Sequence, residues 1–275
     1  MEVGLLGLVL GAVVGLILAL AGAGGGILAV PLLVFGLHLS ILEAAPVGLI
    51  AVGAASAFGA VLGLRDGLVR YRAAAVIGIT GMLLAPVGVR LARLIPNAPL
   101  TVAFSIVLAW VAWRMFNQAR RTVAGEAESP HAQSRLPCVL NPNEGRLVWT
   151  LPCAWALAGT GAVSGVLSGL LGVGGGFVIV PSLSRYTNLA ARSIFATSLA
   201  VIALVSAGGV AAAAWQGSIA WPIAGPFAVG AVVALLAGRL MAARLAGARL
   251  QQAFAVTSGA VSLLLLARGL GWIAA

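Results

Sequence analysis

The amino-acid sequence predicts an all-α polytopic membrane protein with two homologous halves, and three observations support this prediction. Hydrophobic residues make up 61% of the 275 residues and charged residues only 8%, with a mean hydropathy of +1.12. Apolar runs of the roughly 20 residues needed to cross a bilayer fill almost the whole chain. A glycine-rich break at residues 21–26 (AGAGGG) interrupts the first run, and a second at residues 171–176 (LGVGGG) interrupts a later one.

The two glycine-rich breaks lie 150 residues apart, and the same offset relates many other positions. Each break leads into a Val-Pro pair, Val30-Pro31 in the first half and Val180-Pro181 in the second. Further matched pairs are Gly11 and Gly161, Leu49 and Leu199, Gly67 and Gly217, Gly88 and Gly238, and Phe104 and Phe254. This register indicates a gene duplication, with a first transmembrane repeat over 1–118, a polar linker over 119–149 and a second repeat over 150–275.

Each half is predicted to begin with a helical hairpin and to continue with three membrane-spanning helices. In the first half, the hairpin joins a helix at 4–22 to a short apolar arm at 27–37. An arm of about ten residues, at 1.5 Å per residue, covers only about half of a bilayer. We therefore expect this arm to turn back rather than to cross. The three spans that follow are 44–64, 73–95 and 99–118.

The second half repeats this order, with a hairpin over 151–171 and 177–186. Its three spans are 193–214, 222–243 and 250–272. Small residues four apart line one face of the first helix in each half, and such faces allow close helix packing in membranes. These residues are Gly7, Gly11 and Gly15, and then Gly161, Gly165 and Gly169. The same faces suit packing within one chain or between two, so a homodimer is an open alternative.

Arginine supplies every positive side chain behind the net charge of +10, because the chain has no lysine. In a soluble protein this charge suggests nucleic acid as a partner, but in a chain surrounded by a lipid bilayer it marks cytoplasmic loops. If both hairpins return to their starting side, the halves are inverted and 13 of the 16 arginines share one side. If each hairpin is one broken span, the halves are parallel and the split is 9 to 7. The positive-inside rule favours inverted repeats, a cytoplasmic linker and both termini outside.

The paired glycine breaks indicate a binding site for a small anion near the membrane midplane. Inverted repeats with broken helices are typical of transporters, and irregular backbone survives in a membrane only inside protein or beside a cavity. A break leaves backbone N–H groups at the positive end of the next helix, which attracts anions without a charged side chain. The alternative is that the glycines only let helices cross closely. The glycines expected at the site are Gly24, Gly25, Gly26, Gly174, Gly175 and Gly176.

Polar side chains near the second break are further candidates for anion binding. Thr197 and Ser198 follow the second arm and offer hydroxyl groups to an oxyanion. The matching residues of the first half, Val47 and Gly48, have no hydroxyl. The second half is therefore expected to supply more of the polar contacts.

Other polar residues are weaker candidates. Ser164 and Ser168 precede the second break and Ser56 lies in mid-span. For all three the alternative to a site role is a bond back to their own helix, which serines in helices often make. Arg192 is either a cavity residue or, as its position favours, the cytoplasmic end of a span. His38 and Glu43, near the end of the first arm, are candidates for proton handling, although both can reach the membrane interface.

The sequence argues against most enzyme classes. An intramembrane enzyme needs a buried acid, base, nucleophile or metal set, and the chain has no paired Asp, no His-Glu-x-x-His and only two histidines. Without lysine there is no phosphate-binding Gly-x-x-x-x-Gly-Lys loop. Cys138 and Cys153 have no metal-ligand spacing, so we expect neither a disulfide framework nor a zinc site. No other metal and no cofactor is expected either. The membrane subunit of an ATP-driven importer and an anion channel are the alternatives to a secondary transporter.

The duplicated motif Gly-x-Gly-Gly-Gly-x-x-x-Val-Pro, with Thr-Ser-Leu at 197–199 and the stretch from Gly217 to Trp221, resembles the TauE/SafE family of sulfite and organosulfur-anion exporters. The resemblance covers both halves and leaves out the linker. It implies a multi-pass transporter of the bacterial inner membrane, with sulfite, sulfoacetate or another sulfonate as its substrate. It also places Pro31 and Pro181 in the core motif with the six glycines, and Thr197-Ser198 beside that motif.

Overall fold

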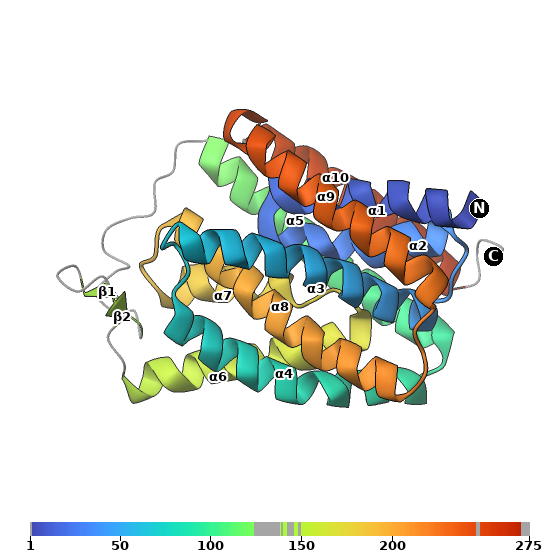
Figure 1. The fold of residues 1–275 in the computed structure, drawn as a ribbon, viewed down its shortest axis with the longest axis horizontal. Helices are drawn as coiled ribbons and strands as arrows, with labels where there is room; N and C mark the ends of the chain where they lie inside the picture. The colour runs from blue at the N-terminus through green and yellow to red at the C-terminus, as the bar shows by residue number, and fades with distance from the viewer. Residues whose placement is uncertain are drawn as a thin grey trace.

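The computed structural model of the chain describes residues 2–123, 138, 140–141, 146–147, 150–245 and 248–270. These residues form ten α-helices, one 3₁₀ helix and one pair of two-residue strands. Seven of the described helices are long and apolar enough to cross a membrane. The predicted all-α polytopic class is therefore confirmed (Figure 1).

The elements of the first half follow the predicted boundaries to within a few residues. The largest difference is in the third span, which continues past its predicted end at residue 118 and stops at Val123. The elements are α1 (Glu2–Ala21), η1 (Gly22–Leu28), α2 (Ala29–Gly36), α3 (Ile41–Arg65), α4 (Tyr71–Leu94) and α5 (Asn97–Val123).

The elements of the second half repeat the order of the first, after a pair of short strands in the linker. Helix α10 ends at Gly269, and the predicted end of this span at residue 272 lies outside the described residues. The elements are β1 (Leu140–Asn141), β2 (Arg146–Leu147), α6 (Leu151–Leu171), α7 (Gly176–Tyr186), α8 (Ala191–Trp215), α9 (Trp221–Leu245) and α10 (Ala248–Gly269).

The ends of the long helices follow from capping residues and glycines. The Ser40 hydroxyl accepts the N–H of Glu43 at 3.3 Å, and the Glu43 carboxylate accepts the N–H of Ser40 at 3.0 Å. This capping box begins α3, so Glu43 has a structural role there. Gly67 and Gly217 follow α3 and α8 with φ angles of 68° and 64°, a region that glycine adopts without strain.

Each glycine-rich break is the tip of a hairpin whose second arm turns back along the first. In the first hairpin, Leu10 of α1 fills the space beside Gly36 of α2. In the second, the Ser164 hydroxyl of α6 donates to the carbonyl oxygen of Gly175 at 3.3 Å. The far ends of α6 and α7 are also close together, because Cys138 contacts both. Both hairpins therefore bring the chain back toward the end of the bundle from which they start.

A disulfide joins Cys138 of the linker to Cys153 in the first turn of α6, so the expectation of no disulfide is wrong. The N–H of Cys138 also donates to the carbonyl oxygen of Tyr186 at the end of α7, at 3.2 Å. The expectation considered only the spacing of the two cysteines, whereas the linker at Cys138 folds back onto the second hairpin. Residue 138 thus ties together the start of α6 and the end of α7.

The first helix of each hairpin packs against a helix of the other half. Helix α1 lies along α9, and α6 lies along α4 (Figure 1). A side chain on Gly11 would overlap the carbonyl oxygen of Phe227, and one on Gly161 would overlap that of Ile77. These two contacts are related by the 150-residue offset, residue for residue. Backbone therefore meets backbone at both helix pairs.

Helices α3 and α8 occupy matching positions in the two halves and pack against each other. Gly53 of α3 lies against Ser206 of α8, and Gly59, further along α3, lies against Leu199, an earlier residue of α8. The two helices therefore run antiparallel. Helices α5 and α10, which also match, pack on each other in the same bundle.

The two ends of the bundle carry different charge. We call the end where α5 stops and α6 begins the linker end, and the end where α1 begins and α10 stops the terminal end (Figure 1). Most of the described arginines lie toward the linker end, and only three lie toward the terminal end. The first group is Arg65, Arg70, Arg72, Arg114, Arg120, Arg185, Arg192 and Arg239, and the second is Arg90, Arg93 and Arg268.

Candidate functional site

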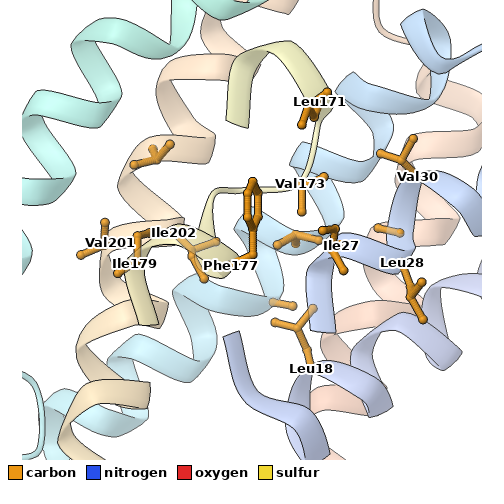
Figure 2. Close-up of a cluster of buried hydrophobic side chains, with 14 of the residues drawn as sticks. Leu18, Ile27, Leu28, Val30, Leu171, Val173, Phe177, Ile179, Val201 and Ile202 are labelled. Atoms are coloured by element: carbon orange, nitrogen blue, oxygen red, sulfur yellow. The ribbon is translucent and has the colours of Figure 1, made fainter. Parts of the chain in front are cut away.

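The two glycine-rich segments meet inside the bundle, between α3 and α8. A Cβ atom on Gly26 would lie 3.2 Å from the carbonyl oxygen of Val173. One on Gly48 of α3 would lie 3.0 Å from the carbonyl oxygen of Gly172. Figure 2 shows Ile27 and Val173, one from each segment, in the same cluster of buried apolar side chains. The fold thus brings together the two segments that the sequence singled out.

The two segments differ in backbone conformation. The first continues from α1 as η1, a 3₁₀ helix over Gly22–Leu28. The second is a non-helical turn, which we call open. In it, Gly174 and Gly175 have φ angles of 78° and 74°, which strain any residue with a Cβ atom. Gly175 is the N-cap of α7, so the first N–H groups of α7, which have no acceptor within the helix, face this segment. The second segment therefore combines a left-handed turn with the donor end of a helix.

A buried hydroxyl without a hydrogen-bond partner lies against the second segment. Ser206 of α8 is 1% exposed, and its Oγ is 3.2 Å from the position of a Cβ atom on Gly174. No described group bonds to this oxygen. The hydroxyls of Thr80, Thr160 and Ser198, by contrast, each donate to the carbonyl oxygen four residues earlier. A buried hydroxyl that lacks such a bond is costly unless a ligand or water completes it.

Ser56 is the counterpart of Ser206 at the 150-residue offset, and it is also buried without a described partner. Ser168, just before the second segment, is a third buried hydroxyl of this kind, and Ser164 bonds to Gly175. The interpretation of Ser56, Ser164 and Ser168 as residues bonded to their own helix is therefore wrong.

Sequence reasoning did not single out Ser206. The repeat offset was the available signal, because it pairs two serines in the middle of two equivalent spans.

The hydroxyls predicted from the sequence, Thr197 and Ser198, are both fully buried in α8. The Thr197 hydroxyl oxygen accepts the N–H of Arg70 at 3.0 Å and so fixes the turn between α3 and α4. The Ser198 hydroxyl donates to the carbonyl oxygen of Ile194 at 2.7 Å. Both therefore have partners within the protein, and Ser206 lies about two turns further along the helix.

The predicted residues of the first half are closely packed. Gly24 and Gly25 lie within η1. A Cβ atom on Gly25 would lie 2.8 Å from the carbonyl oxygen of Ile17, so this glycine allows close contact with α1. Pro31 is buried in α2. The first segment is thus joined to its neighbours by direct packing.

A cavity of about 60 Å³ reaches the second segment from the direction of the linker end. Two predicted site residues, Gly176 and Pro181, line it on the side of α7. Arg114 and Gln118 of α5 are polar groups on the opposite wall. The apolar lining consists of Trp110, Val111, Met115, Phe177, Val180 and Phe195.

The polar groups at the second segment are hydrogen-bond donors rather than metal ligands. Among the described residues, no group of three or more His, Cys, Asp or Glu side chains is placed to hold a metal ion. The polar groups at the second segment are hydroxyls and the N–H groups of a helix N-terminus. Such groups donate hydrogen bonds, which suits the oxygens of a small anion.

A bundle of apolar helices with two helix breaks that meet in its interior is the architecture of a multi-pass membrane transporter. The chain belongs to the TauE/SafE sulfite exporter family, because the family described as "Sulfite exporter TauE/SafE" matches residues 7–265. This is a family of membrane transporters and not a class of enzymes.

Two similar proteins come from two strains of one bacterium, and both are named "Probable membrane transporter protein". The one from Xylella fastidiosa strain 9a5c is 28% identical over 244 residues, which cover 87% of this chain and 85% of that protein. The one from strain Temecula1 is 27% identical over 244 residues, with the same two coverages. No solved structure matches the chain.

Proposed function

We propose that the protein is a secondary transporter that exports a small sulfur-containing anion, such as sulfite, sulfoacetate or another sulfonate, across the bacterial inner membrane. The anion binds near the membrane midplane, between the two glycine-rich segments. Ser206 contacts it directly, while Thr197 and Ser198 support the same helix from the linker end. The backbone of the site comes from Gly24, Gly25, Gly26, Pro31, Gly174, Gly175, Gly176 and Pro181.

The observation that carries this proposal is the unpartnered Ser206 hydroxyl beside Gly174. An oxyanion accepts hydrogen bonds, and both the hydroxyl and the first N–H groups of α7 donate them. The positive end of the α7 dipole favours the same charge. A hydrogen bond to a charged group contributes about 1.5–3 kcal/mol, which is enough for selective binding without a buried arginine. Membership of the family supports a sulfur anion as the substrate.

In this proposal the two repeats, 1–118 and 150–275, are inverted with respect to each other. The antiparallel course of α3 and α8 supports this arrangement, because matched helices of parallel repeats would run the same way. The contacts of α1 with α9 and of α6 with α4 support it too, since each is the counterpart of the other. Inverted halves around a central site provide two similar conformations that open to opposite sides.

The proposed orientation places the polar linker, residues 119–149, in the cytoplasm and both termini outside. The concentration of described arginines toward the linker end supports it. An exporter then collects its anion from the linker end and releases it at the terminal end.

The test is thermal unfolding of the purified protein in detergent with sulfite, thiosulfate, sulfate, sulfoacetate, taurine or acetate at matched ionic strength. A ligand at 100 times its Kd stabilises the native state by about 2.7 kcal/mol. We expect a sulfur anion to raise Tm selectively, and Ser206→Ala to weaken its binding roughly tenfold. Because sulfite attacks disulfide sulfur much as a thiolate does, the panel is repeated on the Cys138→Ser, Cys153→Ser double variant.

The matched control is Ser258→Ala. Ser258 is also buried without a described partner, but it lies on α10, which packs on α5. We expect this variant to keep the full anion effect. If Ser206→Ala and Ser258→Ala lose the anion-induced rise in Tm to the same extent, Ser206 is not part of the site. If no anion of the panel raises Tm beyond the salt background, the substrate is not a sulfur anion.

A further inference from the structure

The cavity toward the linker end places a cation near the open glycine-rich segment. Arg114 and Gln118 lie one turn apart on α5 and form one wall, and Gly176 and Phe177 form part of the other. The Arg114 guanidinium lies 5.4 Å from the centre of the Trp110 ring. The cavity is therefore polar at its α5 wall and reaches the first turn of α7.

The described carboxylates leave the charge of Arg114 uncompensated. Glu43 caps α3 near the terminal end, and Asp66 pairs with Arg239. No described carboxylate contacts Arg114. A guanidinium beside a small cavity attracts an anion into it.

A smaller hollow of about 20 Å³ lies on the other side of the same segment. It is lined by Gly169, just before the segment, and by Ala45, which touches Gly172. Arg93 of α4 also lines it and donates to the carbonyl oxygen of Gln216 at 3.3 Å. Residues 169–176 thus separate two hollows, each with one arginine in its wall.

The corresponding positions of the first half differ from this arrangement. Val180 in the wall of the larger cavity is partly exposed, whereas its counterpart Val30 is 0% exposed. Leu264 stands at the position that matches Arg114. Arg268 stands one turn further along α10, at the position that matches Gln118, and contacts Val34 and Phe35 of α2. The larger space therefore lies beside the second segment, while each hairpin has an arginine on the matching helix of the bundle.

We propose that the anion crosses the protein past the second glycine-rich segment, with Arg114 binding it on the linker side and Arg93 binding it on the terminal side. The identity of the cargo rests on the proposed function, but the path does not. The cavity on the linker side is the larger of the two. Arg93 bonds a backbone carbonyl while its own hollow is narrow.

Transport by oriented proteoliposomes, with sulfite supplied from one side at a time, tests the two arginines. We expect Arg114→Gln to raise the KM for sulfite on the linker side roughly tenfold, with a smaller change in kcat. Arg93→Gln is expected to do the same on the terminal side. The controls are Arg120→Gln on α5 and Arg90→Gln on α4, which remove the same charge from exposed positions outside both hollows.

Cysteine labelling tests the path without transport. In the variant without native cysteines, Val180→Cys and Val30→Cys are treated with a membrane-impermeant anionic thiosulfonate reagent. We expect Val180→Cys to react from the linker side and Val30→Cys to remain unlabelled. Adding Arg114→Gln should slow the anionic reagent severalfold and leave a neutral reagent unaffected, because only the anion is attracted by the guanidinium.

The outcomes separate the path from the proposed function. If the native protein carries sulfite and Arg114→Gln behaves like Arg120→Gln, the role of Arg114 is overturned and the proposed function stands. If the native protein carries no sulfite, the proposed function fails for that anion, and the labelling still decides the path. Equal labelling of Val30→Cys and Val180→Cys would overturn passage beside the second segment.

Discussion

At the scale of single residues, the central site uses groups without formal charge. A charged side chain at the bilayer centre is expensive, and the described arginines lie toward the two ends of the bundle. Near Gly174, the donors are the Ser206 hydroxyl and the N–H groups at the start of α7. In the proposed function, such donors bind an anion without the desolvation cost of a buried charged side chain.

Substitution of Gly174 tests whether the open segment has to keep its conformation. Gly174→Ala introduces strain at φ 78° and brings a Cβ atom to 2.8 Å from Cγ2 of Ile202. We expect the free energy of unfolding to fall by about 1–3 kcal/mol and the anion effect on Tm to be lost. Thermal unfolding with and without sulfite measures both.

Gly217→Ala is the control for backbone strain alone. Gly217 has a φ angle of 64°, and no atom lies within 4 Å of an added Cβ. We expect a cost of about 1–2 kcal/mol and an intact anion effect. If Gly174→Ala also keeps the full anion effect, the second segment is not the binding element.

At the scale of helices, the bundle is held by backbone contacts between the halves. Lipid provides no hydrophobic force between apolar helices, so close packing at small residues has to supply the attraction. Gly165 of α6 meets Gly81 of α4 in this way, and a side chain on Gly165 would overlap the Gly81 carbonyl oxygen. The glycine stripes of the sequence are therefore the contact surfaces of the two helix pairs.

Gly165→Ala is expected to separate α6 from α4. Forcing a methyl group into a filled contact costs about 1–3 kcal/mol, and Tm in detergent should fall accordingly. Gly159→Ala, on the same helix with no atom within 4 Å of the added Cβ, should be neutral or stabilising. Equal Tm values for the two variants would contradict the close contact.

The sequence predicts the helices well and their tips less well. Long apolar runs and the repeat offset predict every long described helix. Most of the helix ends are predicted to within a few residues. The two glycine-rich segments, however, have similar sequences and different backbones, η1 in one case and an open turn at Gly174 and Gly175 in the other. Glycine permits both conformations, so contacts made by the rest of the fold decide between them.

The sequence predicts that the two glycine-rich segments are special, but it does not predict the partners of the nearby side chains. Thr197 was expected near the anion, but it bonds to Arg70, which is 127 residues earlier in the chain. Such a partner is not visible from local spacing. The same is true of the disulfide, because the contact of Cys138 with Cys153 depends on how the linker folds back.

For the whole molecule, the arginines and the disulfide give opposite indications of orientation. Arginines near the linker end place that end in the cytoplasm, whereas disulfides persist in oxidising compartments. Most of the described arginines, from both halves, lie toward the linker end, and the disulfide is a single pair. The proposed orientation therefore follows the arginines, and the disulfide between Cys138 and Cys153 is the observation that speaks against it.

The most direct test of anion export is counterflow by the purified protein in proteoliposomes. Vesicles are loaded with unlabelled sulfite, and radiolabelled sulfite is added outside. We expect saturable accumulation of the label that depends on internal sulfite and is reduced in Ser206→Ala, because a carrier exchanges its substrate through one central site. Flux that does not saturate and does not depend on internal sulfite, or no flux above that of empty liposomes, would contradict a sulfite carrier.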